Sequence, residues 1–109
     1  MILPILAVLR LYLAGAGELA QILGDYGAAR DYYAQALASD LKTYGEDHPA
    51  VARDRNNLGS AWQALGEYDK AIGYFERALA IFERKLGPEH PNTQLVRGHL
   101  AAARAEHKP

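Results

Sequence analysis

Hydrophobic residues recur every three or four positions along most of this chain, which is the spacing of one face of an α-helix. One such stripe lies within residues 50–65, and a second lies within residues 68–86. The first stripe consists of Val51, Leu58, Ala61, Trp62 and Leu65. The second consists of Tyr68, Ala71, Ile72, Phe75, Leu79, Phe82 and Leu86. Only Gly66 and Glu67 separate them, and a break this short predicts two antiparallel helices that pack together.

The same helical pattern covers most of the rest of the chain. Residues 26–44 and residues 92–106 are each expected to form a further helix. Gly87 is typical of a residue that ends a helix, and Pro91 is typical of one that starts the next. No segment shows the alternation of apolar and polar residues that indicates a strand. With a first helix near the N-terminus, the pattern predicts an all-α fold of five helices.

An internal repeat of 42 residues organises these helices. The turn sequence Gly-Asp-Tyr at residues 24–26 returns as Gly-Glu-Tyr at residues 66–68. The closing segment Gly-Glu-Asp-His-Pro at residues 45–49 returns as Gly-Pro-Glu-His-Pro at residues 87–91. Small residues return as well, such as Gly17 and Gly59, and the corresponding Ala29 and Ala71 or Ala36 and Ala78. We expect these small residues where two helices must approach closely, with aromatic side chains filling the gaps around them.

The repeat divides the chain into units. Compared without gaps, residues 9–50 and residues 51–92 are identical at 13 of 42 positions. A third copy supplies only its first helix, at residues 93–106, and residues 107–109 form a short tail. The domain therefore contains about two and a half repeats over residues 9–106. Neither helix pair can bury its apolar stripe alone, so the pairs are expected to stack into one continuous core.

The first nine residues, MILPILAVL, are almost entirely apolar. A secretory leader carries a basic residue before such a run, whereas here Arg10 comes after it. The run is also shorter than the roughly 20 residues that span a bilayer. We expect residues 1–8 to form a helix or cap that packs on the first repeat, with Pro4 near its start, where a missing N–H is harmless. A leader or a contact with another copy are the alternatives.

Composition narrows the classes of function. Half of the residues are hydrophobic and the formal net charge is −1, so we expect a folded domain that binds neither nucleic acid nor membrane. The chain has no cysteine, which excludes disulfides, thiol nucleophiles and cysteine-ligated zinc, and which fits a cytoplasmic location.

The residues at the helix contacts resemble a tetratricopeptide repeat (TPR). The matching positions are Leu58-Gly59, Trp62, Ala71, Phe75 and Ala78. The common period of that family is 34 residues. A period of 42 residues with a Gly-x-x-His-Pro ending is similar to the longer repeats of kinesin light chains and their bacterial relatives. The resemblance implies a right-handed superhelical stack, or α-solenoid, with no catalytic activity, no cofactor and a concave face that holds a peptide segment of a partner protein.

In such a stack, the positions between the core residues of a first helix face the groove. The candidate peptide-binding residues are Arg53, Asn56, Asn57, Ser60, Gln63 and His99. Asparagine is a poor helix former, and an amide can donate to and accept from a peptide backbone at once. The alternative for the two asparagines is that they are solvated or hydrogen-bond a neighbouring helix, and the alternative for His99 is a surface histidine without a ligand. For Arg53, pairing with an acidic group of the partner competes with a solvated surface position.

Other chemistry finds little support in the sequence. His48 and His90 recur with the repeat and each precedes a proline, so we interpret them as residues of a helix start and not as metal ligands. The glycines do not form a phosphate loop, and no nucleophile motif is present, so we expect no enzyme. The preferred function is a protein-interaction module. The alternatives are self-association through the exposed repeat ends, and a fragment of a larger TPR scaffold protein.

Overall fold

The computed structural model describes residues 2–107, without the side chains of residues 2–8, 10 and 11. Within that range the chain forms five α-helices and no strand. The helices are α1 (Ile2–Ile22), α2 (Tyr26–Tyr44), α3 (Pro49–Ala64), α4 (Tyr68–Leu86) and α5 (Pro91–Glu106). The predicted all-α fold is confirmed, and the ends expected for the last four helices are each met within one residue.

The first helix is longer than the repeat boundary suggested. It continues without a break from Ile2 to Ile22, so it passes through residue 9, where the first repeat was expected to begin. Pro4 lies in its first turn, where an α-helix needs no backbone N–H. The alternatives for residues 1–8, a cap or a leader, concern side chains outside the described part of the chain.

The turn inside each helix pair is set by a glycine. Gly24 and Gly66 both have a φ of +82°, a left-handed backbone that glycine adopts without a steric penalty. The next residue, Asp25 or Glu67, then precedes α2 or α4. The Oδ1 atom of Asp25 accepts a hydrogen bond of 3.1 Å from the backbone N–H of Ala28, which caps α2.

The start of each new pair is set by His-Pro. Pro49 and Pro91 are the first residues of α3 and α5, a position that tolerates the missing N–H of proline. The Nδ1 atom of His48 accepts a hydrogen bond of 3.0 Å from the N–H of Ala50, and His90 repeats this contact at 3.1 Å. The recurrence of His-Pro is therefore explained by helix capping, as the interpretation of a helix start predicted.

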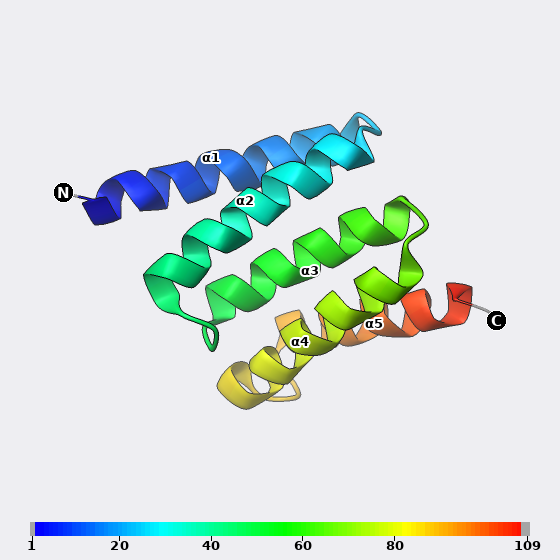
Figure 1. Cartoon of the computed structure of the whole chain (residues 1–109). Coiled ribbons are helices and arrows are strands. Elements are labelled where there is room, and N and C mark those ends of the chain that lie inside the picture. The colour runs from blue at the N-terminus through cyan, green and yellow to red at the C-terminus, as the bar shows by residue number, and fades with distance from the viewer. Residues whose placement is uncertain (1, 108–109) are drawn as a thin grey trace.

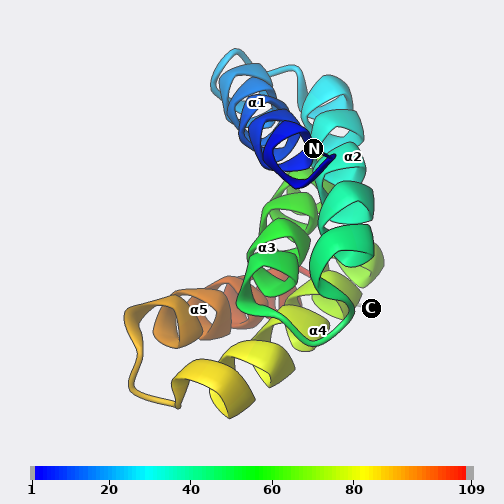
Figure 2. The same cartoon turned by 90° about the vertical axis from the view of Figure 1, so that its left-hand side faces the viewer.

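The five helices form a right-handed superhelical stack in which each helix packs on the next along the chain. Figure 2 shows α1, α3 and α5 along an arc that is open on one side, with α2 and α4 behind it. The first helix of each pair therefore lines the concave side, and the second helix lies on the convex side. Between non-consecutive helices, α3 and α5 also touch each other.

The core consists of two clusters that follow the repeat. The first cluster joins α1, α2 and α3 around Tyr33, and the second joins α3, α4 and α5 around Phe75. Trp62 on α3 packs against both clusters and so connects the two layers. Gly17 and Gly59 face the rings of Tyr33 and Phe75 so closely that a Cβ atom would lie 2.5 Å and 2.8 Å from a ring carbon. The expected close approach at these glycines is confirmed.

Candidate protein-binding groove

A cavity of about 190 Å³ lies on the concave side between α3 and α5. Its lining comprises Arg53, Asn56, Asn57, Phe82, Asn92, Leu95 and Val96. Three of the predicted site residues, Arg53, Asn56 and Asn57, are therefore brought together at one place. We call this cavity and the side chains that line it the α3–α5 groove.

Arg53, Asn57 and Leu95 give the α3–α5 groove its chemistry. Arg53 is exposed and Asn57 lies one helical turn further along α3, half-buried. On the facing helix α5, Leu95 is 53% exposed, which is high for a leucine in the middle of a helix. Arg53 is the one charged residue of the lining. The surface thus offers a guanidinium, a carboxamide and an apolar side chain to a molecule lying between the helices.

Asn56 and His99 bind each other. The Oδ1 atom of Asn56 lies 2.9 Å from Nδ1 of His99, so a residue of the groove lining joins α3 to α5. Asn56 is only 8% exposed, and the His99 ring packs at 5.6 Å between ring centroids against Phe75. For Asn56 the structure shows the hydrogen bond to a neighbouring helix that was the alternative to peptide binding. For His99 the alternative was a surface histidine, whereas the ring is half-buried.

Burial also sets the charge of His99. Removal from water lowers the pKa of the His99 imidazole, because the charged form loses hydration that the apolar surroundings do not replace. The ring is therefore neutral at neutral pH, and its Nδ1–H donates to the Asn56 carbonyl as a neutral hydrogen bond. The groove accordingly keeps a single positive charge, that of Arg53.

The remaining two predicted site residues lie further along α3. The Nε2 atom of Gln63 donates a hydrogen bond to Oε1 of Glu106 at the end of α5, so Gln63 closes the far end of the α3–α5 contact. Ser60 lies on α3 between Asn57 and Gln63. It is half-buried and does not line the α3–α5 groove.

Four residues of the lining, Phe82, Asn92, Leu95 and Val96, were not among the candidates from the sequence. Phe82 was assigned to the apolar stripe of α4, and it reaches the cavity from the helix behind. Asn92 follows Pro91 in the first turn of α5, where its backbone N–H is bound by His90. The residue 42 positions earlier is Ala50, so the repeat gave no signal that Asn92 has a role.

Comparison with known proteins supports the architecture. The sequence profile described as tetratricopeptide repeat matches residues 7–78 and again residues 55–108. This chain belongs to the tetratricopeptide repeat family. The match covers almost the whole chain in two overlapping passes, as the internal repeat predicts. No curated protein matches this TPR chain in sequence.

The TPR fold is also found by structure. The crystal structure of BtubC (BKLC) from P. vanneervenii superposes with a TM-score of 0.85 at 24% sequence identity. The match covers 94% of this TPR chain and 40% of that chain, so the two and a half repeats correspond to less than half of the larger protein. In this TPR domain, α2 and α4 begin 42 residues apart, as do α3 and α5, so the repeat is longer than the common 34-residue form.

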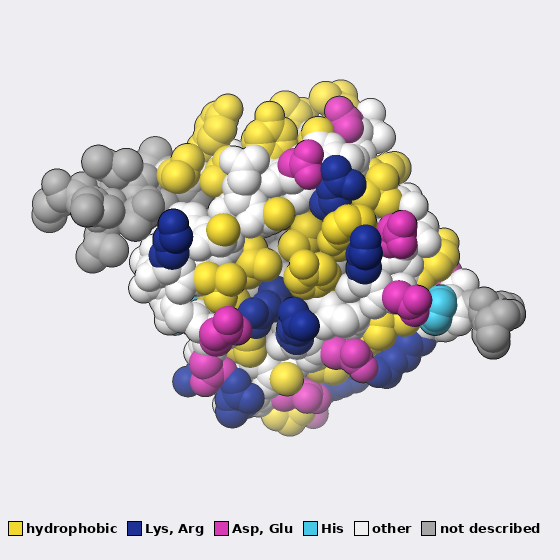
Figure 3. Space-filling view, in the orientation of Figure 1, with side chains coloured by type: hydrophobic (Ala, Val, Ile, Leu, Met, Phe, Trp, Pro, Cys, Tyr) yellow, Lys and Arg dark blue, Asp and Glu magenta, His cyan; other side chains and the backbone are white. Residues whose placement is uncertain are grey.

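The convex side of the TPR stack differs from the groove (Figure 3). Side chains of both charges are scattered there over α2 and α4. The Nζ atom of Lys70 lies 4.3 Å from the centroid of the Trp62 ring, and Arg30 lies 5.3 Å from it, so cation–π contacts tie α2 and α4 to α3. None of the described helices combines the length and apolarity needed to cross a bilayer, and the described side chains include no cluster of three potential metal ligands.

Proposed function

We propose that this TPR domain binds a peptide segment of a partner protein in the α3–α5 groove and has no catalytic role. The observation that carries the proposal is the exposed Leu95 opposite Arg53 and Asn57, on the concave side of a preformed stack. TPR domains generally mediate protein–protein contacts, and a preformed groove lowers the entropy that binding must overcome.

The lining indicates the chemistry of the peptide. Arg53 would pair with a carboxylate, since guanidinium and carboxylate form charge-assisted hydrogen bonds. Asn57 would bind a backbone amide of the peptide, as it both donates and accepts. Leu95, which is exposed, would cover an apolar side chain. The expected ligand is therefore a short segment with an acidic residue close to an apolar one.

A selection from displayed random peptides, using the full chain, tests this function. We expect the enriched sequences to combine acidic and apolar residues. The Arg53→Ala/Asn57→Ala double variant should weaken their binding by on the order of tenfold or more, because it removes a charged and a neutral hydrogen-bonding group. Isothermal titration with one enriched peptide measures the change.

The control is Arg77→Ala, which removes an exposed arginine from α4 on the convex side. It should leave the affinity unchanged. If the double variant binds the selected peptides as tightly as the parent chain does, the α3–α5 groove is not the binding site. Unchanged helical circular dichroism in both variants excludes unfolding as the cause of any loss.

A further inference from the structure

The outer surface of α1 corresponds, by the 42-residue repeat, to surfaces of α3 and α5 that a preceding helix covers. Ala16 and Leu19 correspond, 42 positions on, to Leu58 and Ala61 of α3, which are 2% and 0% exposed because α2 packs on them. In α5 the corresponding side chains are buried in the same way beneath α4. On α1 no described helix occupies this place, and Leu19 is 57% exposed. The internal α2–α3 and α4–α5 interfaces thus define what this surface is shaped to receive, namely another helix.

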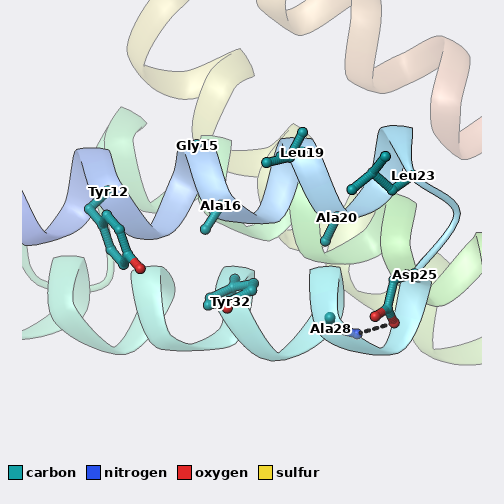
Figure 4. A pocket seen from close by; sticks show the side chains of 9 residues that line it. All are labelled: Tyr12, Gly15, Ala16, Leu19, Ala20, Leu23, Asp25, Ala28 and Tyr32. Carbon is teal, nitrogen blue, oxygen red and sulfur yellow. Dashed lines mark hydrogen bonds between the residues drawn. The ribbon is translucent and has the colours of Figure 1, made fainter.

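The surface is large and apolar. A cavity of about 660 Å³ opens on it between α1 and α2 (Figure 4). Its lining comprises Tyr12, Gly15, Ala16, Leu19, Ala20, Leu23, Asp25, Ala28 and Tyr32. The one carboxylate among them, Asp25, is held by the N–H of Ala28. Figure 3 shows hydrophobic side chains along the edge of the molecule over α1, and an exposed apolar patch of this kind marks an interaction surface.

The spacing of the exposed residues points to pairing between helices. Leu9, Tyr12, Ala16, Leu19 and Leu23 follow one another at intervals of three, four, three and four residues. This is the heptad spacing with which two helices pack side by side along a common seam. In the sequence the same spacing continues back to Ile5 and Ile2, whose side chains lie outside the described part of the chain.

The opposite end of the stack is not complementary to this surface. Trp62 on α3 joins the two core clusters, and the equivalent residue of α5, 42 positions later, is Arg104. Arg104 forms an ion pair of 2.9 Å with Glu76 of α4. Arg97 forms a second pair with Glu83 at 3.2 Å. This surface of α4 and α5 is therefore polar, and a head-to-tail contact would bury these charges against an apolar surface at a large cost.

We propose that two copies of this chain associate through their α1 helices in an antiparallel pair related by a twofold axis. An antiparallel seam of this spacing sets Leu9 against Leu19 of the second copy and Tyr12 against Ala16, so these layers are leucine on leucine and a large residue on a small one. A dimer with a twofold axis uses the same surface on both copies, so that surface must be complementary to itself. The regular apolar spacing along α1 meets this requirement. The α3–α5 groove lies at the other end of the stack and stays open.

The oligomeric state of the full chain tests the interface. Sedimentation velocity over a range of concentrations should show a dimer. Leu19→Asp should raise its dissociation constant by at least about tenfold, since it places an unpaired carboxylate in the apolar seam. The matched control is Leu95→Asp, the same change at a leucine of similar exposure on α5. A strict monomer, or a dimer that Leu19→Asp leaves intact, overturns the proposal.

The direction of the pair can be tested by cross-linking, because the chain has no cysteine of its own. Gly15 and Ile22 flank the seam on one side, one heptad apart, and both are exposed. In the antiparallel pair Gly15 lies near its own counterpart, whereas Ile22 lies far from its counterpart. A short bismaleimide should therefore link Gly15→Cys chains into dimers and leave Ile22→Cys chains unlinked.

Gly98→Cys is the control at the C-terminal end, since Gly98 is also exposed on a helix and has open space around an added Cβ. Linking of both Gly15→Cys and Ile22→Cys would show a parallel pair, and linking of Gly98→Cys would place the interface at the wrong end. Either result overturns the proposed arrangement. Peptide binding by the Leu19→Asp variant is measured separately, so failure of the dimer and failure of the groove are distinguishable.

Discussion

Single residues at the helix contacts decide how closely the helices of a pair can approach. Gly59 stands against the ring of Phe75, and Gly17 stands against that of Tyr33, in the same register of consecutive repeats. The internal repeat was enough to predict a close approach of the helices at these glycines, because it aligned a small residue with a small one and an aromatic with an aromatic.

The Asn56–His99 hydrogen bond was not predictable in the same way. The 42-residue offset pairs His99 with Asn57, yet the side chain that His99 contacts is the preceding one. The offset gives the register of two helices, whereas the partner of a side chain depends on rotamers and on the local distance between α3 and α5.

Substitution of Gly59 tests the close approach. Gly59→Ala should destabilise the fold by about 1–3 kcal/mol, because the added methyl group overlaps the Phe75 ring within a packed core. Gly73→Ala is the matched change on α4, where nothing lies within 4 Å of the added Cβ. It should stabilise the helix by roughly 0.5–1 kcal/mol, the usual advantage of alanine over glycine. Urea unfolding of both variants measures the difference, and equal effects would contradict this account.

At the scale of the elements, the ends of α2 to α5 follow from local chemistry that the sequence displays. Glycine with a positive φ makes the turns, and His-Pro starts α3 and α5. For α1 the sequence indicated only a helix start near Pro4, with no capping residue to fix it. The repeat was counted back to residue 9, but the preceding residues contain no glycine or capping residue that would end a helix, and α1 extends to Ile2.

The histidine caps provide a test of element stability. His90→Ala removes the acceptor for the N–H of Asn92 and should cost about 1 kcal/mol of unfolding free energy, a typical value for a lost N-cap. His90→Asp should retain most of the stability, since aspartate is also a good N-cap acceptor. Thermal unfolding followed by circular dichroism compares the two. If alanine and aspartate are equivalent at this position, the cap contributes nothing and another role for His-Pro is needed.

For the whole molecule, the order in which the helices stack determines which of them are most resistant to local unfolding. Each helix packs on its neighbours along the chain, α3 has contacts with α2, α4 and α5, and α1 packs on α2. The stacked architecture could be predicted from the repeat alone. The difference between an apolar surface on α1 and a polar one on α5 could not be predicted. The exposure of Leu19 and the ion pairs of Arg97 and Arg104 depend on which surfaces the neighbouring helices cover.

Hydrogen exchange should reflect this order. We expect the slowest amide exchange in α3 and α4 and faster exchange in α1, because a repeat stack opens from its ends. The Leu19→Asp variant is the appropriate sample, since it removes any protection that a second copy gives to α1. Mass spectrometry of peptides from each helix measures the rates, and slower exchange in α1 than in α3 would contradict the expectation.

The self-contained start of each helix pair has a consequence for how such a chain can grow. Pro49 and Pro91 open α3 and α5 with the same cap, and every unit relies on its immediate neighbours alone. A duplicate of residues 49–90 spliced in at Pro91 would bring its own turn, its own cap and matching surfaces on both sides. The protein can thus lengthen by whole 42-residue repeats. Each added repeat would extend the interior of the arc without disturbing the helices already in place.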